Sequence, residues 1–166
     1  MGEDKKELHS DLKQLGNGGT VYQYDKPNRL LLETFPNPHY LEPIPGARQL
    51  IVITCPEFTS LCPKTGQPDF ATIRIGYVAD KHCVESKSLK LYLGSFRMHG
   101  EFHESCVHRI SKDLIELLDP DYLQVVGEFT PRGGIPFWPS VEYIRDGLQG
   151  KVDEFVGRMQ GTSSAS

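Results

Sequence analysis

Cys62 and Asp69 lie seven positions apart in the stretch SLCPKTGQPDF, and each of them adjoins a proline. Proline fixes φ and has no N–H to donate, so Pro63 and Pro68 interrupt a regular strand here. Gly66 supplies the backbone freedom that a tight reversal needs. We therefore expect an ordered loop that holds a thiol and a carboxylate at a set separation. From spacing alone, a surface turn with an incidental cysteine is the favoured interpretation.

A thiol beside a carboxylic acid suits addition to an electrophile that itself needs a proton. A nitrile is such an electrophile, because thiolate attack on its carbon leaves charge on nitrogen that an acid can neutralise. Proteolysis is less favoured, since no histidine base occupies an obvious position near Cys62. Cys55 is the competing thiol, but it ends the apolar run LIVIT and is more typical of inert packing.

The stretch HGEFHE places His99 and His103 four residues apart, the spacing of a zinc pair on one helical face. A zinc site would need a further ligand from elsewhere in the chain, and Gly100 interrupts the helix between the two histidines. We therefore expect no metal. The preferred hypothesis is that His103 and Glu104 contact an organic ligand.

Glu104 has a specific use in such a site. An ionised carboxylate accepts two parallel N–H bonds, which matches the N1–H and exocyclic amine edge of a guanine-like base. A helix-start glutamate that the helix dipole favours is equally compatible with the sequence.

Three basic residues are candidates for binding phosphate. Lys87 and Lys90 lie three apart in ESKSLKLY, beside the apolar face of a predicted helix. Periodicity alone favours solvated surface lysines. Arg132 precedes two glycines in PRGG, where the backbone can approach an anion closely.

The composition indicates one domain without a broad anionic partner. The chain has 166 residues and a net charge of −4, with 18 basic and 22 acidic residues and no long basic run. No apolar stretch approaches the roughly 18 residues of a membrane span, and the charged N-terminus does not resemble a signal peptide. The four cysteines contain no CxxC pair. We expect a cytoplasmic protein that binds neither nucleic acid nor a membrane directly.

The predicted element order is ββααββ within a domain over residues 20–158. We expect a polar N-terminal segment over 1–20 and a flexible tail over 159–166. Strands are predicted at 50–54, 70–79, 122–130 and 135–144. One amphipathic helix begins near Ser86, its candidate N-cap, and a second covers 107–118. The predicted fold is α+β, an antiparallel four-stranded sheet with two helices on one face. The absence of G-x-G-x-x-G after a strand argues against a Rossmann site.

The motifs SLCPKTGQPDF, ESKSLKLYL, FHE and FTPRGG together resemble a known enzyme family over about residues 20–145. They are similar to the NADPH-dependent 7-cyano-7-deazaguanine (preQ0) reductases, the QueF family, in their short single-module form. The E-S-K-S-x-K-x-Y motif separates these nitrile reductases from other tunnelling-fold proteins such as the zinc-dependent GTP cyclohydrolases. The resemblance implies a four-electron reduction of preQ0 to 7-aminomethyl-7-deazaguanine (preQ1), a step in queuosine tRNA modification, with NADPH as cofactor.

The resemblance also implies roles for individual residues. Cys62 becomes the nucleophile that forms a covalent thioimide, and Asp69 the proton donor. Two successive hydride transfers then give the amine. The implied substrate contacts are Val84, Glu85, Ser86, His103 and Glu104, and the implied cofactor contacts are Lys87, Lys90 and Arg132.

The implied quaternary structure is a homodecamer. Tunnelling-fold subunits join their sheets into a closed ring with helices outside, and the family pattern is two stacked pentamers with active sites between subunits. Ring closure also removes exposed sheet edges. We further hypothesise that Cys106, three residues after His103, forms a reversible disulfide with Cys62 that protects the nucleophile. A buried helix cysteine is the alternative for Cys106.

Two other functions stay open at this point. A relative could form the same thioimide and transfer it to an amine on deazaguanine-modified tRNA, but it would not need the lysines of ESKSLK. A non-catalytic purine-binding module would not need an intact Cys62 and Asp69.

Overall fold

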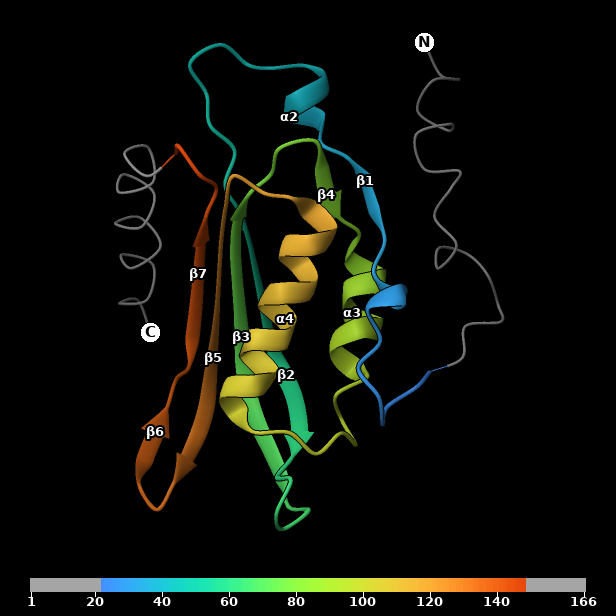
Figure 1. Cartoon of the computed structure of the whole chain (residues 1–166), viewed down its shortest axis with the longest axis vertical. Coiled ribbons are helices and arrows are strands. Elements are labelled where there is room, and N and C mark those ends of the chain that lie inside the picture. The colour runs from blue at the N-terminus through green and yellow to red at the C-terminus, as the bar shows by residue number, and fades with distance from the viewer. Residues whose placement is uncertain (1–21, 149–166) are drawn as a thin grey trace.

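The computed structural model describes residues 22–148, and its centre is an antiparallel sheet. The strands are β2 (Ile51–Leu61), β3 (Pro68–Val78), β5 (Tyr122–Arg132), β6 (Ile135–Phe137) and β7 (Ser140–Ile144). β2, β3 and β5 lie side by side, and β6 and β7 both pair with β5 along its other edge (Figure 1). The predicted segment 1–20, the domain limit at 158 and the tail 159–166 lie outside the described residues.

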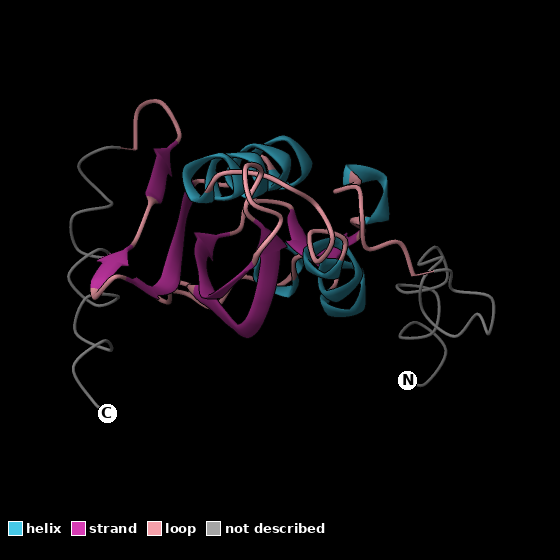
Figure 2. Ribbon diagram, turned by 90° about the horizontal axis from the view of Figure 1, so that it is seen from below, coloured by secondary structure: helices cyan, strands magenta, loops and turns pink. Residues whose placement is uncertain are grey.

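Two helices cover the sheet, as the apolar periodicity predicts. α4 (His103–Leu118) packs against β5 and β7, and α3 (Ser86–Gly94) lies beside it near β2 (Figures 1 and 2). The rings of Phe58, Phe96 and Phe129 join strands and helix in one core, with Phe58 at 5.4 Å from Phe96 and 6.3 Å from Phe129 between centroids. The α+β fold with its antiparallel sheet is therefore confirmed.

Several element limits differ from the sequence prediction, and prolines explain two of them. β2 continues beyond residue 54 to Leu61, because a register shift between Cys55 and Phe58 accommodates Pro56. The single strand predicted at 135–144 is two strands, β6 and β7, since Trp138 and Pro139 interrupt the pairing with β5. α4 begins at His103 rather than at 107.

The structure contains four short elements that the sequence does not predict. They are the 3-10 helix η1 (Arg29–Leu31), β1 (Thr34–Pro36), α2 (Pro38–Leu41) and β4 (His82–Val84). β1 and β4 form a separate two-stranded antiparallel sheet. Segments of three or four residues are too short to show a hydrophobic period, so only tertiary pairing defines them.

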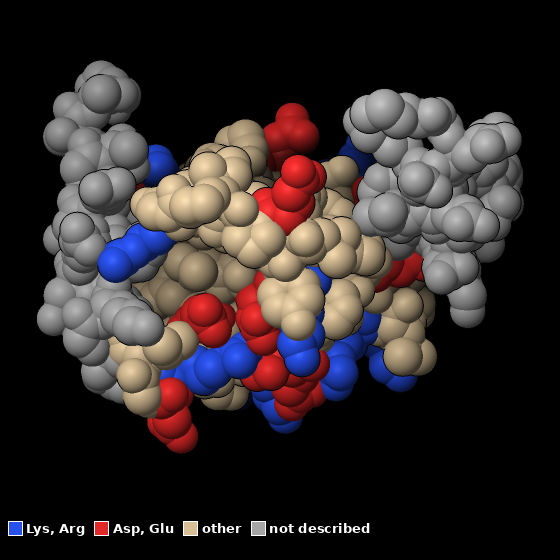
Figure 3. All heavy atoms as spheres, turned by 90° about the horizontal axis from the view of Figure 1, so that it is seen from above, with Lys and Arg blue, Asp and Glu red and all other residues tan. Residues whose placement is uncertain are grey.

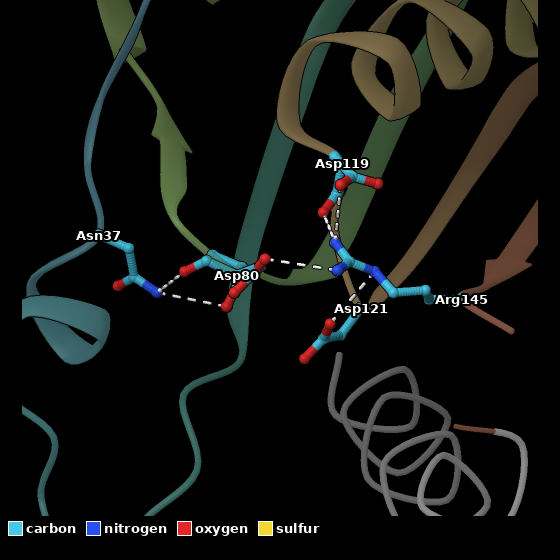
Figure 4. Close-up of polar contacts among 6 residues, drawn as sticks. Asn37, Asp80, Asp119, Asp121 and Arg145 are labelled. Atoms are coloured by element: carbon cyan, nitrogen blue, oxygen red, sulfur yellow. Dashed lines mark hydrogen bonds and ion pairs between the residues drawn. The ribbon is translucent and has the colours of Figure 1, made fainter. Parts of the chain in front are cut away.

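A charged cluster pins one end of the sheet. The Arg145 guanidinium, just after β7, forms ion pairs with Asp80, Asp119 and Asp121 (Figure 4). The Asn37 side chain donates to the backbone carbonyls of Ala79 and Asp80 at 3.2 and 2.8 Å. These contacts tie β1 and α2 to the turn between β3 and β4.

Charged side chains of both signs are mixed on one face of the molecule. Basic and acidic side chains lie next to one another on the face seen in Figure 3. Within residues 22–148, no helix combines the length and the apolar character that crossing a bilayer requires.

Gly127 on β5 lies where α4 packs tightly against the sheet. This close packing leads to a prediction about stability. A Cβ on Gly127 would lie 2.7 Å from Val107 Cγ2 and 2.9 Å from the Phe129 ring. We expect Gly127→Ala to lower the free energy of unfolding by about 1–3 kcal/mol through overpacking. Urea unfolding followed by circular dichroism measures the change. Gly94→Ala is the control, because its Cβ would meet only the Tyr24 ring at 4.0 Å. An unchanged midpoint for Gly127→Ala would contradict the close packing.

Candidate active site

The loop between β2 and β3 is ordered by its own backbone. The Cys62 N–H donates to the Gln67 carbonyl at 2.8 Å, and the Gly66 N–H donates to the Cys62 carbonyl at 2.9 Å. Gly66 has φ of +68°, which a side chain would strain. Asp69 is the second residue of the return strand β3 and pairs with Ser60. The loop thus holds the thiol and the carboxylate as the two prolines and the glycine predict.

The Cys62 thiol is unusually acidic. Hydrogen bonds from the Thr65 hydroxyl and from the backbone at Lys64 and Thr65, with a smaller contribution from Arg132, lower its pKa to about 6. At neutral pH it is therefore mostly the thiolate, which is the nucleophilic form. Burial instead raises the pKa of the other three cysteines, Cys55, Cys83 and Cys106.

Asp69 is a buried carboxylate, only 4% exposed, with two partners from distant parts of the chain. His103 Nε2 lies 3.2 Å from one carboxylate oxygen, and the Arg132 guanidinium forms an ion pair with the other. His103 is held in turn by the Phe129 ring, which stacks on it at 3.8 Å, and by Phe137 at 5.9 Å between centroids. Burial lowers the pKa of His103.

Backbone contacts place the start of α4 beside the loop. The Leu61 N–H donates to the His99 carbonyl at 2.9 Å, and the Glu101 N–H donates back to the Leu61 carbonyl at 3.1 Å. His99 pairs with Glu101, whereas His103 pairs with Asp69. The two histidines therefore have different partners and do not form the pair that a zinc site would need. Glu104 lies in the first turn of α4 and is exposed. Its carboxylate makes no hydrogen bond or ion pair with another residue of 22–148, so both oxygens can accept bonds from a ligand.

A second group of predicted site residues lies where β4 ends and α3 begins. Val84, Glu85, Ser86 and Lys90 line a cavity of about 950 Å³ between α3, β2 and the segment at residues 22–38. Glu85, rather than Ser86, is the N-cap of α3: its carboxylate accepts from the N–H groups of Lys87 and Ser88 at 2.8 and 2.7 Å. The Ser86 prediction was wrong because a carboxylate one residue earlier reaches two donors.

The two groups do not meet within one chain. Cys62, Asp69, His103 and Arg132 gather at the end of the sheet where the β2–β3 loop and the β5–β6 turn lie (Figure 1). The cavity beside α3 is lined by none of them. Arg132 therefore lies with Asp69 and Cys62, and not with Lys87 and Lys90.

Three residues of the site were missed by sequence reasoning. Thr65 acidifies the thiol, and its place in the C-P-K-T-G turn was a usable signal, because a hydroxyl three residues from a cysteine in a tight loop can turn back toward the sulfur. Phe129 and Phe137 hold His103, but only the strand pairing that places them opposite each other brings them there.

Cys106 is fully buried one turn along α4 from His103, and both it and Cys62 are free thiols. Burial raises its pKa to about 12. A protective disulfide between Cys106 and Cys62 stays a prediction.

The acidic thiol can be tested without substrate. We expect the rate of Cys62 alkylation by iodoacetamide to rise with pH around a midpoint of about 6 and then level off as the thiolate saturates. Thr65→Val removes the largest stabilising hydrogen bond and should raise the midpoint. Thr72→Val, in the middle of β3, is the matched control. A midpoint that does not move in Thr65→Val would refute this account of the acidity.

Comparisons with known proteins agree with these features. A family model described as QueF-like protein matches residues 68–147. Proteins named NADPH-dependent 7-cyano-7-deazaguanine reductase are similar: that of Bacillus licheniformis is 57% identical over 81% of this chain and 78% of its own, and that of Streptococcus mutans is 56% identical over 81% and 80%. The crystal structure of an archaeosine synthase QueF-Like in the apo form superposes with a TM-score of 0.54 at 17% identity, over 58% of this chain and 94% of that one, and so shares the fold. The chain belongs to the NADPH-dependent 7-cyano-7-deazaguanine reductase family and has the tunnelling fold.

Proposed function

We propose that this protein reduces the nitrile preQ0 to the amine preQ1 with NADPH, through a covalent thioimide on Cys62. The observation that carries the proposal is the thiol itself. Its pKa is lowered to about 6 in a loop whose other end presents the buried Asp69, the pair that nitrile addition requires. Relatives that are 56–57% identical over 81% of the chain carry the matching name.

Addition needs a nucleophile and an acid acting on the two atoms of the nitrile. The Cys62 sulfur forms a bond to the nitrile carbon, one C–N π bond opens, and its electron pair moves to nitrogen. Asp69 delivers a proton to that nitrogen and becomes a carboxylate, which the Arg132 guanidinium and His103 then stabilise. The Arg132 ion pair favours the ionised carboxylate, so the proposal requires that Asp69 carry its proton when preQ0 is bound, and we expect the bound base to favour that form by excluding water.

Glu104 and His103 are the proposed contacts to the base. Glu104 offers two carboxylate oxygens on the open side of α4, which suits the paired N–H groups of a guanine-like edge. The base is also contacted by residues of the group beside α3, namely Val84, Glu85 and Ser86. Because the Glu85 carboxylate already caps α3, its contribution comes from the backbone or from the lone pairs that remain.

The cavity beside α3 fits a phosphorylated cofactor. Lys90 and Arg97 line it together with apolar and aromatic side chains, a donor set that suits phosphate groups joined to flat rings. When bound, NADPH supplies the hydrides that reduce the thioimide and then the imine. Lys90, which lines the cavity, would bind its phosphates, and Lys87, which lies on α3 outside the lining, is the second proposed contact. Arg132 contributes from the other group, where it is also bonded to Asp69.

The separation of the two groups supports an active site that forms between subunits. Each chain has one group at the β2–β3 loop and the other beside α3, so two copies are needed to bring them together. β2 is an edge strand in the single chain and exposes Val52 by 57%. Pairing such edges around a ring covers them, in agreement with the proposed homodecamer of two stacked pentamers.

Cofactor stoichiometry tests the reaction. With preQ0 limiting, we expect two molecules of NADPH to be oxidised per nitrile, as measured by the loss of absorbance at the nicotinamide band. When NADPH is omitted, we expect intact-mass spectrometry to detect a covalent adduct on Cys62. Cys62→Ala should show neither signal. Asp69→Asn should form the adduct at least about 100-fold more slowly, since general acid catalysis contributes at least that factor. Adduct formation without any NADPH oxidation would refute the reductase and favour the amine-transferring relative.

Mixed oligomers test the shared site. Cys62→Ala leaves the group beside α3 intact, and Ser86→Arg leaves the Cys62 group intact while obstructing the cavity. We expect each variant alone to be inactive and co-expressed chains to recover activity, because some interfaces then join two intact groups. Mixtures of two separately purified, non-exchanging oligomers are the control. No recovery in co-assembled oligomers would mean that each chain builds its own site.

A further inference from the structure

Arg97 differs from most other arginines of residues 22–148 because it forms no ion pair there with a carboxylate. NADPH differs from NADH by one phosphomonoester on the adenosine ribose, and an enzyme that depends on NADPH contacts that group with cations. This inference rests on the proposed function and asks which residues of the chain recognise the extra phosphate.

Most arginines in the described part of the chain form ion pairs with carboxylates. The pairs are Arg29 with Glu116, Arg74 with Glu128, Arg109 with Glu101, Arg132 with Asp69, and Arg145 with Asp80, Asp119 and Asp121. Arg48 precedes β2 and does not line the cavity. Arg97 lines the cavity and makes no ion pair with any residue of 22–148.

An aromatic ring holds the Arg97 side chain in place. Its guanidinium carbon lies 5.8 Å from the centroid of the Tyr24 ring, and Tyr22 stacks on Tyr24 at 6.1 Å. The Met98 N–H donates to the Tyr24 carbonyl at 2.6 Å, which fixes this segment against the residues that follow α3. A guanidinium over a ring face keeps its N–H groups directed outward in its plane, where they can form two parallel bonds to a phosphate.

The same cavity carries a second cation and little opposing charge. Lys90 also lines it and makes no ion pair with a described residue. The acidic residues in the lining are Glu57 and Glu85, and the Glu85 carboxylate is occupied in capping α3. The chain has a net charge of −4, yet Arg97 and Lys90 at this cavity form no ion pair with a residue of 22–148. Two such cations indicate an anionic ligand.

We propose that Arg97, held on Tyr24 and assisted by Lys90, binds the ribose 2′-phosphate of NADPH and so selects it over NADH. The position is suitable for the adenosine end of the cofactor. α3 runs for about 12 Å from Ser86 to Gly94, and Arg97 lies beyond that end, away from the residues proposed to contact the substrate. The exposed face of Tyr22 and Tyr24 provides aromatic surface for an adenine ring.

Binding of cofactor fragments to the full chain tests the site without turnover. Titration calorimetry compares adenosine 2′,5′-bisphosphate with adenosine 5′-monophosphate. We expect wild type to prefer the bisphosphate, and Arg97→Gln to lose about 10- to 100-fold of that preference, with affinity for the monophosphate unchanged. Arg97→Lys should keep part of it. Lys81→Gln, an exposed lysine outside the cavity, is the matched control.

Kinetics give the second measurement. The ratio of kcat/KM for NADPH to that for NADH should fall in Arg97→Gln by a factor similar to the loss in binding, while kcat at saturating NADPH is retained. Unchanged discrimination in Arg97→Gln, or a wild type that does not distinguish the two fragments, would overturn the site even if the nitrile is reduced. Conversely, Arg97-dependent discrimination in a protein that does not reduce preQ0 would uphold the site and refute the proposed reaction.

Discussion

The buried carboxylate of Asp69 is the constraint on which the catalytic end of the structure depends. An ionised carboxylate removed from water is costly unless it is paired and hydrogen-bonded. Its partners are Arg132 at the end of β5 and His103 at the start of α4, and the loop that carries it also carries Cys62. Three segments far apart in sequence must therefore converge at one place. The stacking of His103 on Phe129 and the hydrogen bonds between Leu61 and the residues before α4 are the contacts that hold them there.

The convergence of these three segments also brings Arg132 close to both Asp69 and Cys62. Arg132 is bonded to Asp69 and also lowers the pKa of Cys62, so one guanidinium stabilises both anions of the proposed reaction. Thr65 and the loop backbone contribute more to the acidity of the thiol than Arg132 does. Consequently the Cys62 thiol is made acidic mainly within its own loop, while the Asp69 carboxylate is positioned by the tertiary structure.

The division of the proposed site between two parts of the chain gives assembly a direct role. The loop group holds the acidic thiol and the buried carboxylate, and the cavity beside α3 is lined by cations and aromatic rings that suit a nucleotide. Neither group is complete for a reaction between a nitrile and a nicotinamide cofactor. On this proposal, activity requires that subunits associate, which couples the folding of the ring to function.

Sequence alone was sufficient for the features that depend on local chemistry and period. The prolines and glycine around Cys62 predict the loop, the apolar repeats predict α3 and α4, and the motifs predict the family. Short elements such as β1 and β4 could not be predicted, because three residues carry no period and only their mutual pairing stabilises them. The ion pair of Arg132 with Asp69, and an Arg97 that forms no ion pair within residues 22–148, were decided by the tertiary structure alone. Each depends on which charged groups lie within a few ångströms of one another, and the energy of a charge is set by those neighbours and by its distance from water.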